Sequence, residues 1–371
     1  MANSTLGIIF SNIQEKNVPE LSKRRTMASI PFAGRYRLVD FALSNMVNSG
    51  ITAVGIVTKS NYQSLIDHLG SGKDWDLARK GGGIILLPPY SNDMEKPYTT
   101  RLEALMAVSG FLSSRREDYV VIYDCDGVAR MDLADMLRFH EENNADITMA
   151  YSEQKSIDAH YYITLDNDTM GRVKHVNITP RLDGKTKVNL YINVMIIKRE
   201  YLLDIMQSAA ERGQGSFSRD ILARNVDDMR IFGYKFNGYY AAIDSLPGYY
   251  KHSMEQLDKK VRDELYGARD IYTKVGDSAP TKYLDGAVVK NSLIADGCVI
   301  EGTVENSILF RGVKVGNGSV IKNSVVMQKT IIGSNVKMDS VITDKNVVIS
   351  DRRSLSGCAE LPYFIAKGTM L

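Results

Sequence analysis

The sequence predicts an α/β domain over residues 1–265 and a parallel β-helix over residues 281–371, joined by a linker at 266–280. Short apolar runs alternate with amphipathic stretches in the first part, which is typical of buried parallel strands connected by helices. After residue 280, aliphatic residues recur every six residues, as they do when short strands stack into coils. With 371 residues, 44% of them hydrophobic, the chain is long enough to build a core in each part.

Composition excludes several classes of function. A net charge of +2 argues against a surface for nucleic acid. The three cysteines lie far apart and form no CxxC, so neither a disulfide framework nor a zinc site is expected. No apolar run approaches the roughly 20 residues that cross a bilayer, and the N-terminus lacks a basic region followed by an apolar stretch. We therefore expect a cytoplasmic protein with no membrane and no nucleic-acid partner.

The first apolar run, 6–10, reads as a buried strand, so the segment after it should face the ligand crevice at the carboxyl edge of the sheet. Further strands are predicted at 53–57, 119–123, 147–151 and 191–197, with a helix at 251–265. His140 lies on the apolar side of a helix that begins after Asp132. We interpret it as a histidine at the edge of the core rather than a ligand.

Three tracks of aliphatic residues define the β-helix repeat. They are Val315, Ile321 and Met327; Val320, Val326, Ile332 and Met338; and Val336, Ile342 and Val348. Taken alone, this pattern also fits a hexapeptide acyltransferase. The region from Ala279 onward contains no histidine that could serve as its general base.

Residues 21–50 carry a specific pattern. Its landmarks are Leu21-Ser22, Arg25, Pro31-Phe32, Arg35-Tyr36-Arg37, Asp40-Phe41 and Leu43-Ser44-Asn45. This stretch closely resembles the signature of the sugar-nucleotide pyrophosphorylases, above all bacterial glucose-1-phosphate adenylyltransferase (ADP-glucose pyrophosphorylase). The resemblance implies a Rossmann-like nucleotidyltransferase domain followed by a left-handed β-helix of hexapeptide repeats. It also implies the reaction of ATP with glucose 1-phosphate, assisted by magnesium.

The chain departs from that family where its chemistry resides. The departures are Asn12, Ile13, Glu15 and Asn17 in the glycine-rich phosphate loop, Met27 for the phosphate-binding Lys, Thr100, Arg101 and Leu102 for Gly-Thr-Ala, Thr179 for the sugar-phosphate Lys, and Ala242 for the second metal-binding Asp. A phosphate loop needs tight turns with little side-chain bulk, and Glu15 places a carboxylate where phosphate oxygens would lie. We interpret Arg101 as the solvated start of a helix, and we expect Arg101 and Leu102 to crowd the nucleotide pocket.

Some features of the family site persist. Asp126 falls on the position of the metal-binding Asp, and Asp244 shares a strand face with Ala242, displaced by roughly 7 Å. Gly81, Gly82 and Gly83 match a glycine run that lies beside the nucleotide base in the family. Taken alone, these glycines form only a permissive turn; with their matching flanks, we interpret them as a residual nucleotide loop. Asn193 occupies the place of a sugar-facing glycine.

The chain thus resembles the GlgD-type partner of the adenylyltransferase, a non-catalytic subunit without a cofactor of its own. Magnesium is expected in the catalytic partner, with which it would form a hetero-oligomer, a tetramer as in the family. The basic residues Lys23, Arg24, Arg25, Arg35 and Arg37 are a candidate site for a phosphorylated effector, or else a solvated surface or a subunit contact. A slow nucleotidyltransferase using Asp126 and Asp244, and a module that senses a sugar phosphate or nucleotide, remain alternatives.

Overall fold

The computed structural model describes residues 4–89, 98–155, 162–178 and 187–371. By their internal contacts, the residues form two compact units. The first comprises Met1–Glu15, Arg25–Ala28 and Phe41–Tyr240, and the second comprises Lys16–Arg24, Ser29–Asp40 and Ala241–Leu371. This grouping differs from the sequence boundaries at 265 and 281, because the helices before the linker and two N-terminal segments join the second unit.

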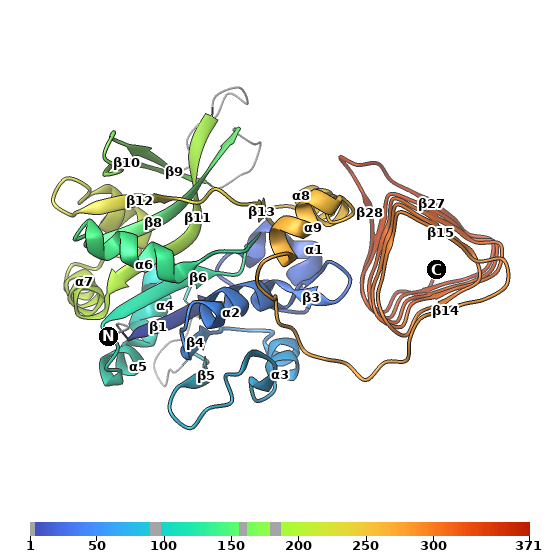
Figure 1. Cartoon of the computed structure of the whole chain (residues 1–371), viewed down its shortest axis with the longest axis horizontal. Coiled ribbons are helices and arrows are strands. Elements are labelled where there is room, and N and C mark those ends of the chain that lie inside the picture. Colours follow the sequence, from blue (N-terminus) through green and yellow to red (C-terminus); the bar gives the residue numbers. More distant parts are fainter. Residues whose placement is uncertain (1–3, 90–97, 156–161, 179–186) are drawn as a thin grey trace. The chain divides into compact units, whose positions relative to one another are not determined.

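A nine-stranded mixed sheet organises the described part of the first unit (Figure 1). Its strands are β1 (Thr5–Phe10), β4 (Ala53–Val57), β5 (Gly83–Leu87), β6 (Tyr119–Asp124), β8 (Ile147–Lys155), β9 (Ile163–Asn167), β10 (Val173–Ile178), β11 (Lys187–Lys198) and β12 (Ile231–Lys235). The order is β10-β9-β11-β6-β1-β4-β5, and β8 pairs with β11 and β12. Strands β6, β1, β4 and β5 are parallel, whereas β11 runs antiparallel to β6.

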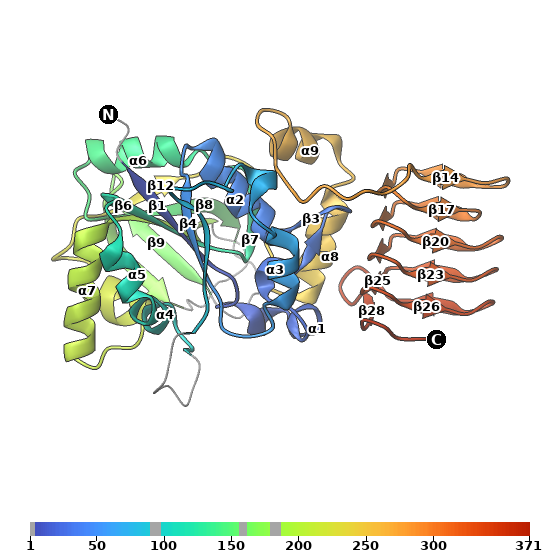
Figure 2. The same ribbon diagram turned by 90° about the horizontal axis from the view of Figure 1, so that it is seen from below.

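Helices cover both faces of this sheet, with α2 and α6 on one side and α4 and α5 on the other (Figure 2). The helices of this region are α2 (Leu38–Asn48), α3 (Gln63–Leu69), α4 (Arg101–Ala107), α5 (Ser109–Ser114), α6 (Leu133–Glu142), α7 (Arg199–Glu211) and a π-helical segment, Phe217–Ala223. Successive side-chain positions of β1 lie on opposite faces of the sheet. Leu6, Ile8 and Phe10 join the core under α4, whereas a side chain at Gly7 would collide with Met46 of α2.

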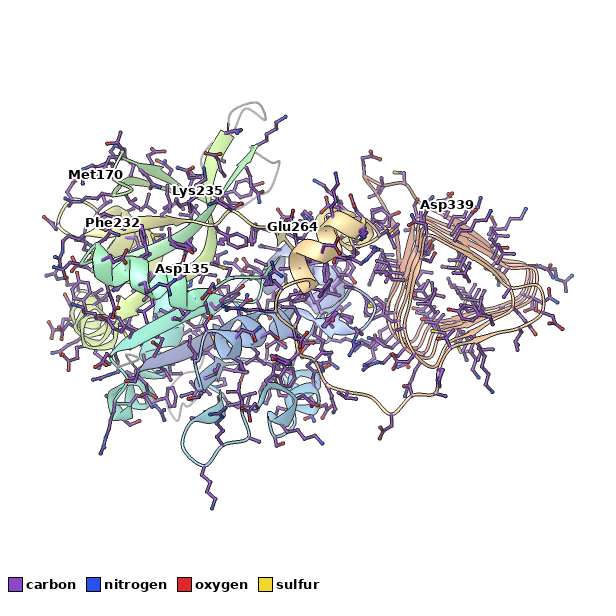
Figure 3. All side chains as sticks on the ribbon, in the orientation of Figure 1. Asp135, Met170, Phe232, Lys235, Glu264 and Asp339 are labelled. Atoms are coloured by element: carbon purple, nitrogen blue, oxygen red, sulfur yellow. The ribbon has the colours of Figure 1, made fainter. Side chains whose placement is uncertain are left out.

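Aromatic and polar contacts fix α6 on β12. Phe139 packs edge-on against Phe232 and Tyr234, and the Tyr234 hydroxyl donates to Asp135 at 2.6 Å. Figure 3 labels Asp135 and Phe232 on these two elements. His140 is buried on the inner side of α6, as the sequence indicated, with its Nδ1 2.8 Å from the Thr148 hydroxyl.

The C-terminal part of the second unit is a parallel β-helix, which Figure 1 shows as a triangle in cross-section. Its three five-stranded sheets follow β14-β17-β20-β23-β26, β15-β18-β21-β24-β27 and β16-β19-β22-β25-β28. The first and last strands are β14 (Lys282–Tyr283) and β28 (Tyr363–Ile365), and β23 spans Ile331–Ile332. The residues of the three predicted tracks are buried, except Val320 and Val348, which are half-buried. The predicted coil architecture is therefore confirmed.

Two helices and two N-terminal segments complete the second unit. They are α8 (Leu246–Glu255), α9 (Lys259–Tyr266), α1 (Pro19–Ser22) and the hairpin of β2 (Pro31–Phe32) with β3 (Tyr36–Arg37). The Tyr250 hydroxyl donates to the Asn323 carbonyl, and Tyr36 stacks on Tyr266 with ring centroids 5.3 Å apart. None of the described helices combines the length and apolar character needed to cross a membrane.

Candidate functional site

The carboxyl ends of four parallel strands define the candidate site in the first unit. Strands β1, β4, β5 and β6 end at Phe10, Val57, Leu87 and Asp124. Ligands of open α/β sheets bind outside this edge. The loops that follow these strands therefore supply the side chains that decide the chemistry.

A buried ion pair occupies the end of β6. Arg101 Nη2 lies 2.6 Å from Asp124 Oδ2, and the two side chains are only 7% and 2% exposed. Burial by itself would lower the pKa of Arg101, but the neighbouring Asp124, Tyr191 and Asp126 raise it above its usual value, so the guanidinium stays charged. The expectation that Arg101 is solvated was therefore wrong, because a carboxylate 23 residues away in sequence neutralises it inside the protein.

Asn193 joins this ion pair to Asp126. Its Nδ2 donates to Asp126 Oδ2 at 2.7 Å, and its Oδ1 accepts from Arg101 Nη2 at 3.1 Å. The register of β11 shifts between Tyr191 and Met195, and Asn193 there has φ of +57°. Asparagine tolerates this left-handed conformation better than other residues with a side chain, apart from Asp. It can therefore occupy a glycine position while its amide fills the space that glycine would leave open.

Asp126 is held in an unusual electrostatic environment. Burial, and next the charge of Asp124, raise its pKa to about 7, although Arg101 and the Asn193 amide act in the opposite direction. One guanidinium thus faces two buried carboxyl groups.

The side chains of the loop after β1 are engaged in contacts within the protein and do not leave space for a ligand. Asn12 is buried, accepts from the Ser11 hydroxyl, and directs its Nδ2 to the Ser60 carbonyl at 3.4 Å. Ile13 packs against the apolar core. Glu15 forms an ion pair with Lys59, with Oε1 and Nζ 2.7 Å apart. These side chains take the space and charge that a glycine loop would leave for phosphates.

Three other altered positions serve local structure. Thr100 is the N-cap of α4 and forms a capping box with Glu103. Leu102 and Met27 are fully buried, and Leu102 belongs to the core between α4 and the sheet. The expectation that Leu102 crowds the pocket was wrong, because the helix turns this side chain away from Arg101 and into the core.

The structure does not bring Gly81, Gly82 and Gly83 to the site. Gly83 begins β5, so the run lies at the amino edge of the parallel strands, opposite the edge where Asp124 ends β6. A side chain at Gly82 would collide with the Thr52 carbonyl and one at Gly83 with the Leu77 carbonyl, and both glycines have positive φ. We correct the interpretation accordingly: these glycines form a permissive turn, in which backbone conformation and packing require glycine at Gly82 and Gly83.

The remaining predicted residues lie elsewhere. Asp244 Oδ1 accepts from the Ser245 hydroxyl at 3.1 Å, and it follows β13 (Tyr240–Ala242), which ends at Ala242. Both belong to the second unit, as does the half-buried Asn17. Thr179 lies outside the described residues.

The basic cluster is only partly a surface. Arg25 is buried, so it cannot take part in a solvated effector site. Lys23, Arg24 and Arg35 are exposed, and Arg37 is half-buried. The Arg35 guanidinium lies 5.5 Å from the centroid of the Tyr36 ring.

Sequence reasoning placed Asp124 at the carboxyl edge of the sheet without assigning it a role, and it did not consider Lys59. Asp124 ends a buried strand and Lys59 follows one within two residues, so each lies at the carboxyl edge. That position in the topology was the available signal. Their partners, Arg101 and Glu15, could not be identified without the three-dimensional contacts.

Magnesium, the ion that the family resemblance implies, does not fit these residues as they are arranged. The Arg101 guanidinium already pairs with Asp124, and the Asn193 amide donates to Asp126. Ala242 supplies no carboxylate, and the described residues contain no group of three His, Cys, Asp or Glu side chains arranged around a metal. A divalent cation would meet the positive charge of Arg101.

Comparison with known proteins agrees with both parts of the fold. The nucleotidyl transferase family model matches residues 16–236, and the model of the GlmU-like C-terminal hexapeptide matches residues 280–357. This confirms the predicted Rossmann-like nucleotidyltransferase domain and the left-handed β-helix of hexapeptide repeats.

Individual relatives cover most of the chain. The glycogen biosynthesis protein GlgD of Bacillus subtilis is 34% identical over 99% of this chain and 96% of its own length. The glucose-1-phosphate adenylyltransferases of Bacillus thuringiensis and Bacillus mycoides are 33% and 32% identical, each over 89% of both chains.

Proposed function

The chain belongs to the nucleotidyl transferase family, and from this premise we propose that it is a non-catalytic or weakly active modulatory subunit of a glucose-1-phosphate adenylyltransferase in glycogen biosynthesis. One observation carries the proposal: Arg101 and Asn193 engage the buried carboxylates of Asp124 and Asp126 from within the chain. Arg101 supplies the positive charge that a metal ion would bring. The ion pair of Glu15 with Lys59 supports the same conclusion at the phosphate loop.

The partner in this proposal is a catalytic adenylyltransferase subunit in a hetero-oligomer. That subunit would bind ATP, glucose 1-phosphate and magnesium and form ADP-glucose and pyrophosphate. The names of the relatives support this choice. The chain resembles a glycogen biosynthesis protein, GlgD, and the glucose-1-phosphate adenylyltransferases to a similar degree, so its proposed partner is taken from the second group. We propose no cofactor for this chain itself.

The test is ADP-glucose synthesis by this chain alone, by a catalytic subunit from the same organism alone, and by the two coexpressed. Activity confined to preparations that contain the catalytic subunit, with an altered maximal rate in the mixture, is the expected result. Robust turnover by this chain alone, lost in Asp126→Ala, would contradict the proposal.

A weakly active nucleotidyltransferase is a second candidate. Asp124 Oδ1 and Asp126 Oδ1 are buried and have no hydrogen-bond partner among the described residues, so these oxygens remain open to a cation if Arg101 moves away. Isotope exchange between pyrophosphate and ATP by the isolated chain would reveal such activity. Exchange at background level in both the natural chain and Asp126→Ala would remove this candidate.

The proposal also includes a binding site for a phosphorylated effector. Lys23, Arg24, Arg35 and Arg37 are the basic residues at which we place it, Arg25 being buried. Charge reversal of Arg35 and Arg37 should alter the effector response of the coexpressed complex without unfolding the chain. An unchanged response together with unchanged assembly would discard the site.

A further inference from the structure

The segment between α9 and β14, which the structure describes throughout, contains no helix or strand. We call this segment, residues 267–281, the strap; Figure 1 shows it in orange, leading from α9 to β14. Ile271 and Thr273 are buried, only 7% and 5% exposed, whereas Val275 is 69% exposed. The strap is therefore packed against the protein at its first residues and open to solvent directly afterwards.

Arg311 holds the strap against the β-helix. Its Nη1 donates to the Lys274 carbonyl at 3.3 Å, and its Nε lies 3.1 Å from Asp296 Oδ2. The Gly312 amide donates to the Asp296 carbonyl, so the two charged side chains project from adjacent coils. One guanidinium thus connects the strap with two successive coils of the β-helix.

The backbone of the strap passes close to this guanidinium. A β-carbon at Gly276 would lie 3.2 Å from Arg311 Nη1 and 3.4 Å from its Cζ, so the absence of a side chain permits the approach. Further along, the Ala279 carbonyl accepts from the Gly297 amide at 2.7 Å. The strap is therefore attached at Lys274 through a side chain of the β-helix and at Ala279 through its backbone.

The attachment through Arg311 is weak for physical reasons. The side chains of Arg311 and Asp296 are 22% and 36% exposed, so water screens their attraction. Arg311 Nε is buried and has no aligned hydrogen-bond acceptor among the described residues, although Asp296 lies near it. A buried N–H group without an acceptor costs free energy in the attached state. Segments held by so few contacts open locally before the whole structure unfolds.

We propose that the strap is a conformational latch: Arg311 fastens it to the β-helix, and it opens locally when this guanidinium releases the Lys274 carbonyl, while the coils stay folded. Opening exposes the buried residues of the strap and extends the unattached chain as far as Ala279. Salt favours the open state, because it screens the attraction between Arg311 and Asp296. The latch does not depend on whether the chain turns over substrate.

Trypsin cleavage after Lys274 measures the opening, because the carbonyl that Arg311 binds belongs to the peptide bond that trypsin cuts. When opening and closing are fast, the cleavage rate follows the population of the open strap. Arg311→Gln should raise this rate about tenfold, which corresponds to the loss of one hydrogen bond and one partly exposed ion pair. In the natural chain the rate, relative to a free peptide of the same sequence, should rise between about 0.01 M and 1 M salt. An unchanged relative rate would overturn the proposed part of the ion pair.

Arg353→Gln is the matched control, because it also replaces an arginine of the β-helix, one that is exposed. It should leave cleavage after Lys274 unchanged. Asp296→Asn removes the ion pair but keeps the bond to the Lys274 carbonyl, so its cleavage rate should be intermediate; this variant serves if Arg311→Gln does not fold. Equal cleavage rates for Arg311→Gln and Arg353→Gln would overturn the proposal.

Hydrogen exchange separates opening of the strap from unfolding of the β-helix. The Lys314 amide donates to the Thr330 carbonyl at 3.0 Å between neighbouring coils, so its exchange rate should be the same in Arg311→Gln and in the natural chain. Faster cleavage after Lys274 with unchanged exchange of this amide supports the latch. An exchange rate that rises by the same factor as the cleavage rate would mean that the coils unfold together with the strap, and the latch would be rejected.

Discussion

The carboxyl edge of the α/β sheet and the coils of the β-helix satisfy buried polar groups in different ways. In the β-helix, hydrogen bonds recur between equivalent positions of successive coils, as when Ser324 N donates to Ser307 Oγ and Val341 N to Ser324 Oγ. At the sheet edge, Arg101 pairs with Asp124, which is 23 residues away in sequence, and Asp126 also acts on the guanidinium. The β-helix repeats its hydrogen bonds from coil to coil, whereas the pair of Arg101 with Asp124 has no repeated equivalent among the described residues.

The largest effect that this comparison predicts comes from Arg101→Met. The substitution removes the guanidinium and leaves Asp124 buried with an uncompensated charge, which should cost about 3–5 kcal/mol of unfolding free energy. Urea unfolding measures the loss, and adding Asp124→Asn should recover part of it.

Arg138→Met is the matched control for this substitution. Arg138 pairs with Asp135 on the surface of α6, where both side chains are largely exposed and solvent screens the pair, so its loss should cost far less than the loss of Arg101. Equal losses of unfolding free energy for the two arginines would mean that burial does not strengthen the pair of Arg101 with Asp124. The contrast between the sheet edge and the β-helix would then be wrong.

Inside the β-helix, neighbouring isoleucines of β23 sharpen the comparison. Ile332 points into the coils and is 2% exposed, whereas Ile331 faces outward and is 43% exposed. Ile332→Ala should cost about 2–4 kcal/mol through the cavity that it leaves, and Ile331→Ala should cost well under half as much. Unfolding followed by a probe in the β-helix measures both, and similar losses would contradict the inward register of the repeat.

His140 predicts a pH dependence that belongs to the first unit. Burial, and next the charge of Lys198, lower its pKa from 6.5 to about 4, while Asp146 acts in the opposite direction. Between those values the unfolded chain binds the proton and the folded chain does not, so stability present above pH 6.5 is lost as the pH falls toward 4. The loss attributable to this residue should be on the order of 2 kcal/mol.

His140→Gln isolates this contribution, because glutamine does not titrate but can still bond to the Thr148 hydroxyl. The difference in unfolding free energy between the natural chain and the variant should change between pH 6.5 and 4 and be constant above pH 7. A constant difference over the whole range would show that His140 takes up its proton in the folded state as readily as in the unfolded chain.

The same contrast explains what the sequence could predict. The β-helix was readable because each side chain's role repeats with a fixed period, so Ile321, Val326 and Ile332 could be assigned to the interior in advance. Arg101 could not, because its burial depends on Asp124, and Leu102 beside it faces the core by helical geometry alone. Local pattern fixes which residues are apolar and inside, but only the tertiary contacts decide which charges neutralise each other.

The smallest predicted effect concerns the local support of the buried pair. Thr100 caps α4 immediately before Arg101: its hydroxyl accepts from Glu103 N at 3.2 Å and donates to the Gly215 carbonyl at 2.5 Å. Thr100→Ala should cost about 1 kcal/mol, and Thr100→Ser, which keeps the hydroxyl, should cost less than half of that. If Arg101 is held mainly by Asp124, combining Thr100→Ala with Arg101→Met should give the sum of the two losses in urea unfolding. A combined loss well below the sum would mean that the cap positions the guanidinium, so that the sheet edge depends on local structure as the β-helix does.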